Sequence, residues 1–160
     1  MQRREAIGVL GAAAVGTGAV MASVRDQFIG VYRLVSYQRK AQDGTITDVY
    51  GPTPIGRITY DAAGRMSGFL MRPNRGRPKD PRTPTVEEYR EIQSGFVAYM
   101  GTFDVDEASK TVTHHVEAAL NPAWPGTDLK RTYEFAGNRL TLSVAGPTSL
   151  KLVWERQPDR

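Results

Sequence analysis

Short segments with alternating apolar and polar residues, separated by turns, fill this 160-residue chain from residue 30 to residue 156. Such alternation predicts β-strands that bury one face. The links are mostly short, so consecutive strands are expected to pair as antiparallel neighbours. The eight predicted strands are Val31–Gln38, Ile55–Asp61, Arg65–Arg72, Tyr99–Val105, Thr111–Leu120, Leu129–Phe135, Arg139–Val144 and Leu150–Arg156. Eight antiparallel strands can close into a barrel with room for one small ligand.

One helix is predicted within this series. Thr85 and Glu88 have the spacing of a capping box, in which each side chain satisfies a free backbone N–H of the other residue. Apolar residues follow at helical spacing, namely Val86, Tyr89, Ile92, Phe96 and Val97. We therefore predict an all-β fold, an eight-stranded antiparallel up-and-down barrel with one helix inserted between strands three and four. The helix is expected to lie on the barrel or to cover its mouth.

The composition excludes several kinds of site. The chain contains no cysteine, which rules out disulfides and thiolate metal ligands. Its net charge of +4 is far from the concentrated basic surface that nucleic acids require, so no nucleic-acid partner is expected. It contains no glycine-rich phosphate-binding motif and no Gly-x-Ser-x-Gly nucleophile motif. We therefore expect no cofactor.

The first 22 residues have the character of a targeting segment. Arg3 and Arg4 precede an uncharged, glycine-containing run from residue 6 to residue 22, and cleavage after Ala22 fits a signal peptidase. The paired arginines resemble a twin-arginine export signal. We predict a signal peptide over residues 1–22, a barrel domain over residues 23–160, and export to the periplasm or the extracellular space. The alternative is an uncleaved N-terminal membrane anchor. No stable membrane insertion of the mature domain is expected, because no other stretch is long and apolar enough.

A series of short motifs runs through the predicted barrel in a characteristic order and spacing. It comprises Tyr50-Gly51-Pro52, Gly56-Arg57, Tyr60-Asp61, Gly64-Arg65-Met66, Met71-Arg72-Pro73, Ala98-Tyr99, Gly101-Thr102, the run from Val112 to Glu117, and Gly126-Thr127-Asp128. In this series, residues 28–156 resemble the bacterial lipocalin-like domain family. Gly30-Val31-Tyr32 and Arg156 also resemble the Gly-x-Trp and covering Arg of lipocalins, with Tyr in place of Trp. The resemblance implies a small β-barrel with an internal cavity, but it does not imply one activity.

His114 and His115 are the chain's two histidines, and they are adjacent. Neighbouring residues of a strand point to opposite faces, so the pair is not expected to share a metal ion. His115 shares a face with Glu117, while His114 shares the more apolar face with Val112, Val116 and Ala118. The sequence leaves open which face is internal. A cavity-facing His with Glu117 could act in general acid–base catalysis. The preferred interpretation of these polar residues is cross-strand pairing on the outer surface.

Aromatic residues are candidates for the cavity wall. Tyr60 and Tyr99 lie in different predicted strands, and their amphipathic rings could orient a ligand. Trp124 lies in a proline-bounded loop, where a rim or lid position explains a large aromatic side chain. Met66 and Met71 complete the apolar part of the predicted ligand-binding set.

Two arginines within predicted strands are also candidates. Arg57 and Arg131 would ordinarily point into solvent. If either points inward, it needs a partner such as Glu117 or a ligand carboxylate, because an unpaired buried charge is very unfavourable.

Two main function classes remain open. The first is a protein that binds a small, mostly apolar ligand, one that could carry a carboxylate. The second is a cofactor-free isomerase, cyclase or hydrolase that uses a His, Glu and Tyr set as proton carriers. A histidine that faces the cavity beside Glu117, Arg57 or Tyr99 would favour the enzyme. A third option is a cell-envelope protein without a small ligand.

Overall fold

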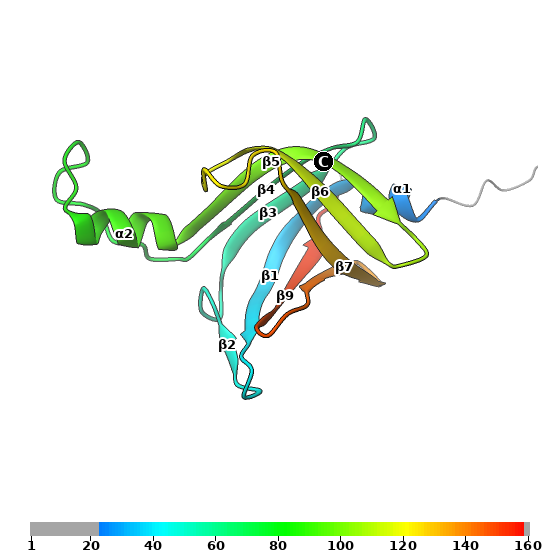
Figure 1. The fold of residues 1–160 in the computed structure, drawn as a ribbon, viewed down its shortest axis with the longest axis horizontal. Coiled ribbons are helices and arrows are strands. Elements are labelled where there is room, and N and C mark those ends of the chain that lie inside the picture. The colour runs from blue at the N-terminus through cyan, green and yellow to red at the C-terminus, as the bar shows by residue number, and fades with distance from the viewer. Residues whose placement is uncertain (1–22, 159–160) are drawn as a thin grey trace, which may run out of the picture.

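The computed structural model describes residues 23–158, so the predicted signal peptide of residues 1–22 lies outside the described residues. Strands dominate this part of the chain (Figure 1). The elements are α1 (Val24–Phe28), β1 (Gly30–Lys40), β2 (Ile46–Asp48), β3 (Ile55–Tyr60), β4 (Arg65–Met71), α2 (Val86–Ser94), β5 (Phe96–Asp106), β6 (Thr111–Ala119), β7 (Asp128–Ala136), β8 (Arg139–Val144) and β9 (Ser149–Arg156). Neither helix of the described segment has the length and apolar character needed to span a membrane.

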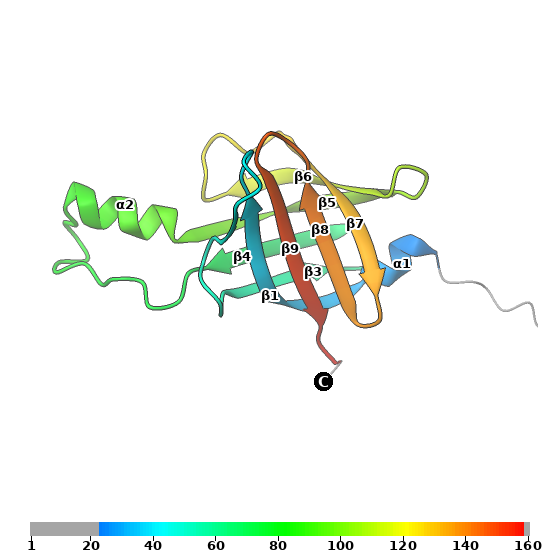
Figure 2. The same ribbon diagram turned by 90° about the horizontal axis from the view of Figure 1, so that it is seen from below.

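The strands form a closed antiparallel barrel. Their order is β1-β3-β4-β5-β6-β7-β8-β9, and β9 pairs back onto β1 to close the sheet (Figure 2). The predicted all-β, eight-stranded antiparallel up-and-down barrel is therefore confirmed. Within the barrel, each strand pairs with the barrel strand that follows it along the chain, as expected for an up-and-down barrel.

The position of the helix in the strand order differs from the prediction. α2 lies between β4 and β5 instead of between strands three and four. The cause is the short strand β2, which adds one strand before the helix and pairs with the end of β1 outside the barrel. β2 was missed because its three residues are all exposed and carry no buried alternation.

α2 neither lies on the barrel nor covers its mouth. It begins with the predicted capping box of Thr85 and Glu88, but none of its residues is buried. Figures 1 and 2 show it projecting beyond the barrel. The prediction failed because Phe96 and Val97 belong to β5, which leaves the helix few apolar side chains to bury.

The barrel end next to α1 is closed by aromatic packing. Phe28 is fully buried, and its ring lies edge-on to those of Tyr60, Tyr133 and Phe135, with centroids 4.9–5.3 Å apart. Arg156 of the last strand lies over the Tyr32 ring, with its Cζ 4.8 Å from the ring centroid. The lipocalin-like pairing expected from the sequence is therefore present.

That Arg156 contact explains the glycine at position 30. The guanidinium donates a hydrogen bond of 2.6 Å to the Ile29 carbonyl and another of 2.6 Å to the Tyr32 hydroxyl. Gly30 has a φ of 144°, and a Cβ there would collide with the Arg156 guanidinium. Only glycine combines this backbone conformation with so close an approach.

A β-bulge alters the predicted faces of β6. Met100 pairs with Ala118 and Gly101 with Val116, so Glu117 is an extra residue opposite β5. The bulge leaves both Glu117 and Ala118 exposed, although alternation alone assigned Ala118 to the face of His114. Gly101 permits the close approach, because a Cβ there would collide with the His115 carbonyl.

Candidate functional site

The barrel contains an apolar cavity of about 200 Å³ in the half away from Phe28. Aliphatic side chains of β8 and β9 form one wall, and aromatic side chains of β1, β5 and β9 contribute to the rest. Its lining residues are Tyr37, Ile58, Gly68, Leu70, Val97, Tyr99, Trp124, Arg131, Leu142, Val144, Leu150, Leu152 and Trp154. A cavity of this kind, mostly apolar with a few polar groups, is typical of a small-molecule site.

Arg131 is the charged residue of the cavity lining. The alternation of β7 places it on the inward face with the buried Tyr133. Its guanidinium donates a hydrogen bond of 2.9 Å to the carbonyl of Lys130. Among residues 23–158 no carboxylate forms an ion pair with it. The cavity therefore presents a positive charge that has no counterion among the described residues.

His114 lies inside the barrel, fully buried behind the cavity wall. Its Nε2 is 2.8 Å from the Tyr60 hydroxyl, and its Nδ1 is 2.9 Å from the Tyr99 hydroxyl. Burial lowers the pKa of His114 to about 3, and the charges of Arg131 and His115 act in the same direction. The imidazole is therefore neutral at ordinary pH, and both of its nitrogens are occupied.

The two tyrosines remain protonated as well. Burial raises the pKa of Tyr99 to about 12 against the opposing effect of Arg131. Burial also raises the pKa of Tyr60 well above its ordinary value, and the neighbouring tyrosines act in the same direction. Tyr60, His114 and Tyr99 thus form a neutral hydrogen-bonded chain that joins β3, β6 and β5.

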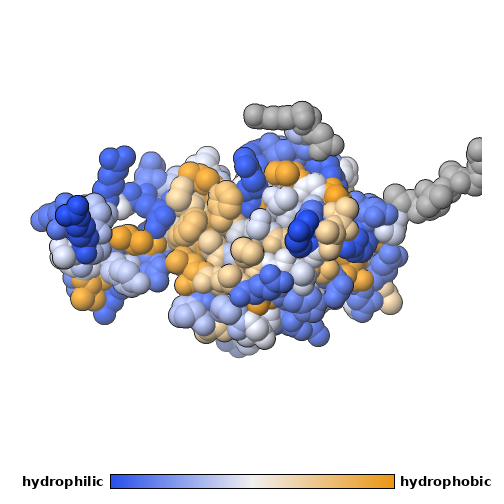
Figure 3. All heavy atoms as spheres, turned by 90° about the horizontal axis from the view of Figure 1, so that it is seen from above, coloured by the Kyte–Doolittle hydropathy of each residue, from blue (hydrophilic) through white to orange (hydrophobic). Residues whose placement is uncertain are grey.

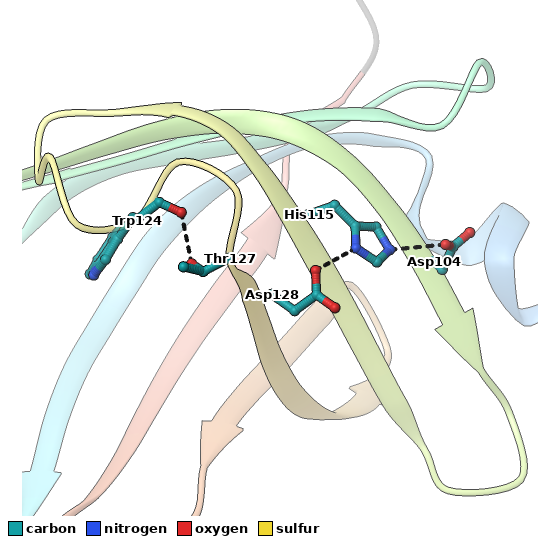
Figure 4. Close-up of polar contacts among 5 residues, drawn as sticks. All are labelled: Asp104, His115, Trp124, Thr127 and Asp128. Carbon is teal, nitrogen blue, oxygen red and sulfur yellow. Dashed lines mark hydrogen bonds and ion pairs between the residues drawn. The ribbon is translucent and has the colours of Figure 1, made fainter.

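His115 points to the outer surface and binds two carboxylates (Figure 4). Its Nδ1 is 2.7 Å from Asp128 Oδ1, and its Nε2 is 3.0 Å from Asp104 Oδ2. Hydrogen bonds to Asp128 and Asp104 raise the pKa of His115. This cluster ties β5, β6 and β7 together outside the cavity. Within the described part of the chain, no group of three or more His, Asp or Glu side chains is arranged to hold a metal ion.

The three predicted catalytic residues are therefore not brought together. His114 is internal and hydrogen-bonded at both nitrogens, whereas His115 and Glu117 lie outside the barrel. The bulge at Glu117 directs its side chain to an outer groove shared with Asp61 and Arg65. His114 does lie beside Tyr99, but it has neither Glu117 nor Arg57 next to it.

Trp124 lies at the rim of the cavity. Its ring meets that of Tyr99 nearly at right angles, with centroids 5.7 Å apart. The Trp124 carbonyl accepts a hydrogen bond of 2.7 Å from the Thr127 hydroxyl, which fixes the turn just before Asp128 (Figure 4). Trp124 and Val97 also line an outer groove of about 490 Å³ beside α2. Trp124 thus lies between the cavity and this groove.

The other predicted ligand-binding residues do not line the cavity. Arg57 is exposed on the outer face, because β3 directs its neighbour Ile58 and Tyr60 inward. Met66 is buried in the core, and Met71 is half-buried at the end of β4. Tyr60 lies behind the wall and reaches the site through His114. Of the predicted set, Tyr99, Trp124 and Arg131 line the cavity.

Sequence reasoning missed most of the apolar lining. Leu142 and Val144 end β8, and Leu150 and Leu152 begin β9, so all four lie at the same end of the barrel. The sequence could have indicated them, because alternation places these side chains on the inward face of β8 and β9 at the barrel end opposite α1. Trp154 is buried, and it also forms part of the cavity wall.

Comparison with known proteins fits this architecture. A family model described as "Lipocalin-like domain" matches residues 29–157. The chain belongs to the lipocalin-like domain family. The match covers all strands of the lipocalin-like barrel, from β1 to β9.

One curated relative of this lipocalin-like protein carries a functional name. It is the 4'-hydroxy-3'-methoxypropiophenone carrier protein of Aspergillus oryzae (strain ATCC 42149 / RIB 40). The two chains are 29% identical over 108 residues, which cover 58% of this chain and 97% of the relative. The family and this carrier together support ligand binding as the general role of the barrel.

Proposed function

We propose that the protein binds a small, mostly apolar ligand in the barrel cavity and that the ligand carries a carboxylate or a similar anionic oxygen. The observation that carries the proposal is Arg131, a cation on an otherwise uncharged cavity wall with no carboxylate partner among the described residues. Arg131 is half-buried against an apolar wall, so its guanidinium loses part of its hydration there, and a counterion would compensate for that loss. A bound anion would supply that counterion, while the aliphatic and aromatic wall would cover the rest of the ligand.

The carrier relative supports the size and the mostly apolar character of such a ligand, but its name specifies no carboxylate. Its name specifies an aromatic ketone with hydroxyl and methoxy groups. A molecule of that kind has an apolar ring and oxygen atoms, which matches a wall of leucine, valine and aromatic side chains with one polar region. We propose a ligand of comparable size for this protein.

Binding is favoured over catalysis by the state of the titratable groups. Both nitrogens of His114 are engaged, and its low pKa makes it a poor proton acceptor at neutral pH. His115 and Glu117, the other candidate proton carriers, lie on the outer surface.

We also propose that the barrel works after export, which the paired arginines and the uncharged run of residues 6–22 support.

The first test is native mass spectrometry of the protein purified gently from its own host. We expect a stoichiometric small molecule that is released on denaturation and carries an anionic oxygen. A stoichiometric ligand without such a group would contradict the role assigned to Arg131. If the purified protein carries no ligand, binding is tested by adding small-molecule probes.

The second test is a matched titration with 3-phenylpropanoate and propylbenzene, which differ mainly in the carboxylate. We expect Arg131→Met to weaken 3-phenylpropanoate binding by about ten- to a hundredfold, since a charge-assisted hydrogen bond is lost. Propylbenzene binding should not change. Arg57→Met is the control, because Arg57 is on the outer face. Equal effects of the two variants, or no binding of either probe to the wild type, would overturn the proposal.

A further inference from the structure

We propose that Tyr60 and His114 orient the hydroxyl proton of Tyr99 into the cavity, so that the site selects ligands that present an oxygen acceptor at this position. A ketone, ester or carboxylate oxygen has this property, whereas a hydrocarbon or a group that can only donate does not. The inference rests on the proposed function, since it concerns the same cavity. It goes beyond that function by assigning a selecting role to Tyr99 and a positioning role to the two residues behind it.

The argument begins with the number of protons in the buried chain. A neutral imidazole has one N–H donor and one bare nitrogen that accepts. Both nitrogens of His114 contact tyrosine hydroxyls, at 2.8 Å and 2.9 Å. One tyrosine must therefore donate to His114, and the other must accept from it. Two arrangements are possible, and they differ in which tyrosine keeps a free hydroxyl proton.

Tyr60 decides between the two arrangements. It is 1% exposed, and within residues 23–158 its hydroxyl has His114 as its hydrogen-bond partner and no other. If Tyr60 accepted from His114, its own proton would be buried without an acceptor, which is strongly unfavourable. Tyr60 therefore donates to Nε2. The proton of His114 is then on Nδ1, which donates to the oxygen of Tyr99.

The direction of these bonds leaves the Tyr99 hydroxyl proton free. Tyr99 lines the cavity, and none of the described residues accepts a hydrogen bond from it. The acceptor must then come from the cavity contents. Because the Tyr99 oxygen already accepts from His114, it is also a better donor, as hydrogen bonds in a chain polarise one another.

Two other polar groups of the wall, Arg131 and the indole of Trp154, have the same preference. Arg131 can only donate, and so can the indole of Trp154. Trp154 Nε1 is buried and has no acceptor among the described residues. The lining includes no Asp, Glu, Asn or Gln side chain. The cavity wall is therefore rich in donors and poor in side-chain acceptors, which favours a ligand that supplies oxygen atoms.

The first experiment compares propiophenone with propylbenzene, two probes of similar shape that differ in one carbonyl oxygen. We expect the wild type to bind propiophenone about tenfold more tightly. In Tyr99→Phe the two probes should bind with nearly equal affinity, because propiophenone binding weakens while propylbenzene binding is unchanged. Tyr89→Phe is the matched control, because Tyr89 is 55% exposed on α2. A preference that survives in Tyr99→Phe, or a wild type that binds neither probe, would overturn the inference. The proposed function would be overturned only if 3-phenylpropanoate also failed to bind.

The second experiment reads the histidine protons directly and needs no ligand. Nitrogen-15 NMR of histidine-labelled protein should show His114 protonated at Nδ1 and bare at Nε2, with His115→Gln used to assign the signals. The opposite tautomer in the wild type would overturn the inference even if ligands bind. Tyr60→Phe removes the donor to Nε2, so we expect the His114 signals to shift. The preference for propiophenone should also decrease several-fold, although Tyr60 does not line the cavity.

Discussion

The two ends of the barrel use similar residues for different purposes. At the α1 end, Phe28 fills the interior, and Arg156 donates to the Ile29 carbonyl and the Tyr32 hydroxyl. At the opposite end a cavity remains, and Arg131 has no ion-pair partner among the described residues. An arginine with protein partners contributes to packing, whereas an arginine without them can bind a ligand. The comparison indicates that stability is concentrated at one end and recognition at the other.

The same contrast is found across the wall at β6. His114 and His115 are adjacent, yet one is neutral inside the barrel and the other is paired with carboxylates outside. Apolar groups are also exposed outside, where Figure 3 shows them gathered on the barrel beside α2. Phe69, Met100 and Leu120 are 39–51% exposed and line one shallow outer groove.

The largest expected effect follows from removing the aromatic plug. Phe28→Ala should lower the free energy of unfolding by about 3–5 kcal/mol, because it removes a fully buried ring and leaves a void. Urea denaturation measures this change. Tyr89→Ala, on the exposed helix, should change stability by no more than about 0.5 kcal/mol. A loss below about 1 kcal/mol in Phe28→Ala would show that the α1 end does not concentrate stability.

An intermediate effect is expected at the open end. Trp124→Ala removes the ring between the cavity and the outer groove, so 3-phenylpropanoate should dissociate about tenfold faster. Stopped-flow fluorescence with Trp154 as reporter measures this rate. The effect on unfolding should be smaller than that of Phe28→Ala, because Trp124 is only half-buried.

The control for this change is Leu120→Ala, since Leu120 lines the outer groove but not the cavity. It should leave the dissociation rate nearly unchanged. Equal rates for wild type and Trp124→Ala would mean that Trp124 does not restrict access to the cavity.

The smallest expected effect concerns the cluster outside the wall. Asp128 and Asp104 raise the pKa of His115 above its ordinary value of 6.5. Protonated His115 therefore stabilises the folded state relative to the unfolded chain. The stabilisation is fully present below about pH 6.5 and is lost as pH rises through the raised folded-state pKa. His115 is 38% exposed, so solvent screening should keep this contribution under about 1 kcal/mol.

Urea denaturation of the wild type and of His115→Gln tests the direction of this pH dependence. The measurements run from about pH 5 to about pH 9, on both sides of the ordinary histidine pKa. The stability difference should be largest at the acidic end and should shrink at the alkaline end. A difference that grows with pH would contradict the assignment.

Elements that depend on local pattern were predictable from the amino-acid sequence. Alternation and turn residues defined the eight barrel strands, and Thr85 and Glu88 defined the start of α2. Adjacency also required the two histidines to point to opposite faces. These features follow from the twofold period of a strand and from bonds within one turn of helix.

Tertiary structure decided everything that depends on which strands meet. Alternation could not show that Arg131 faces inward while Arg57 faces outward, nor that a bulge exposes Ala118. The chain from Tyr60 through His114 to Tyr99 joins three strands, and only the closed barrel brings them within hydrogen-bond distance. Local sequence sets the period of a strand, but its register and inner face are set by partners far away along the chain.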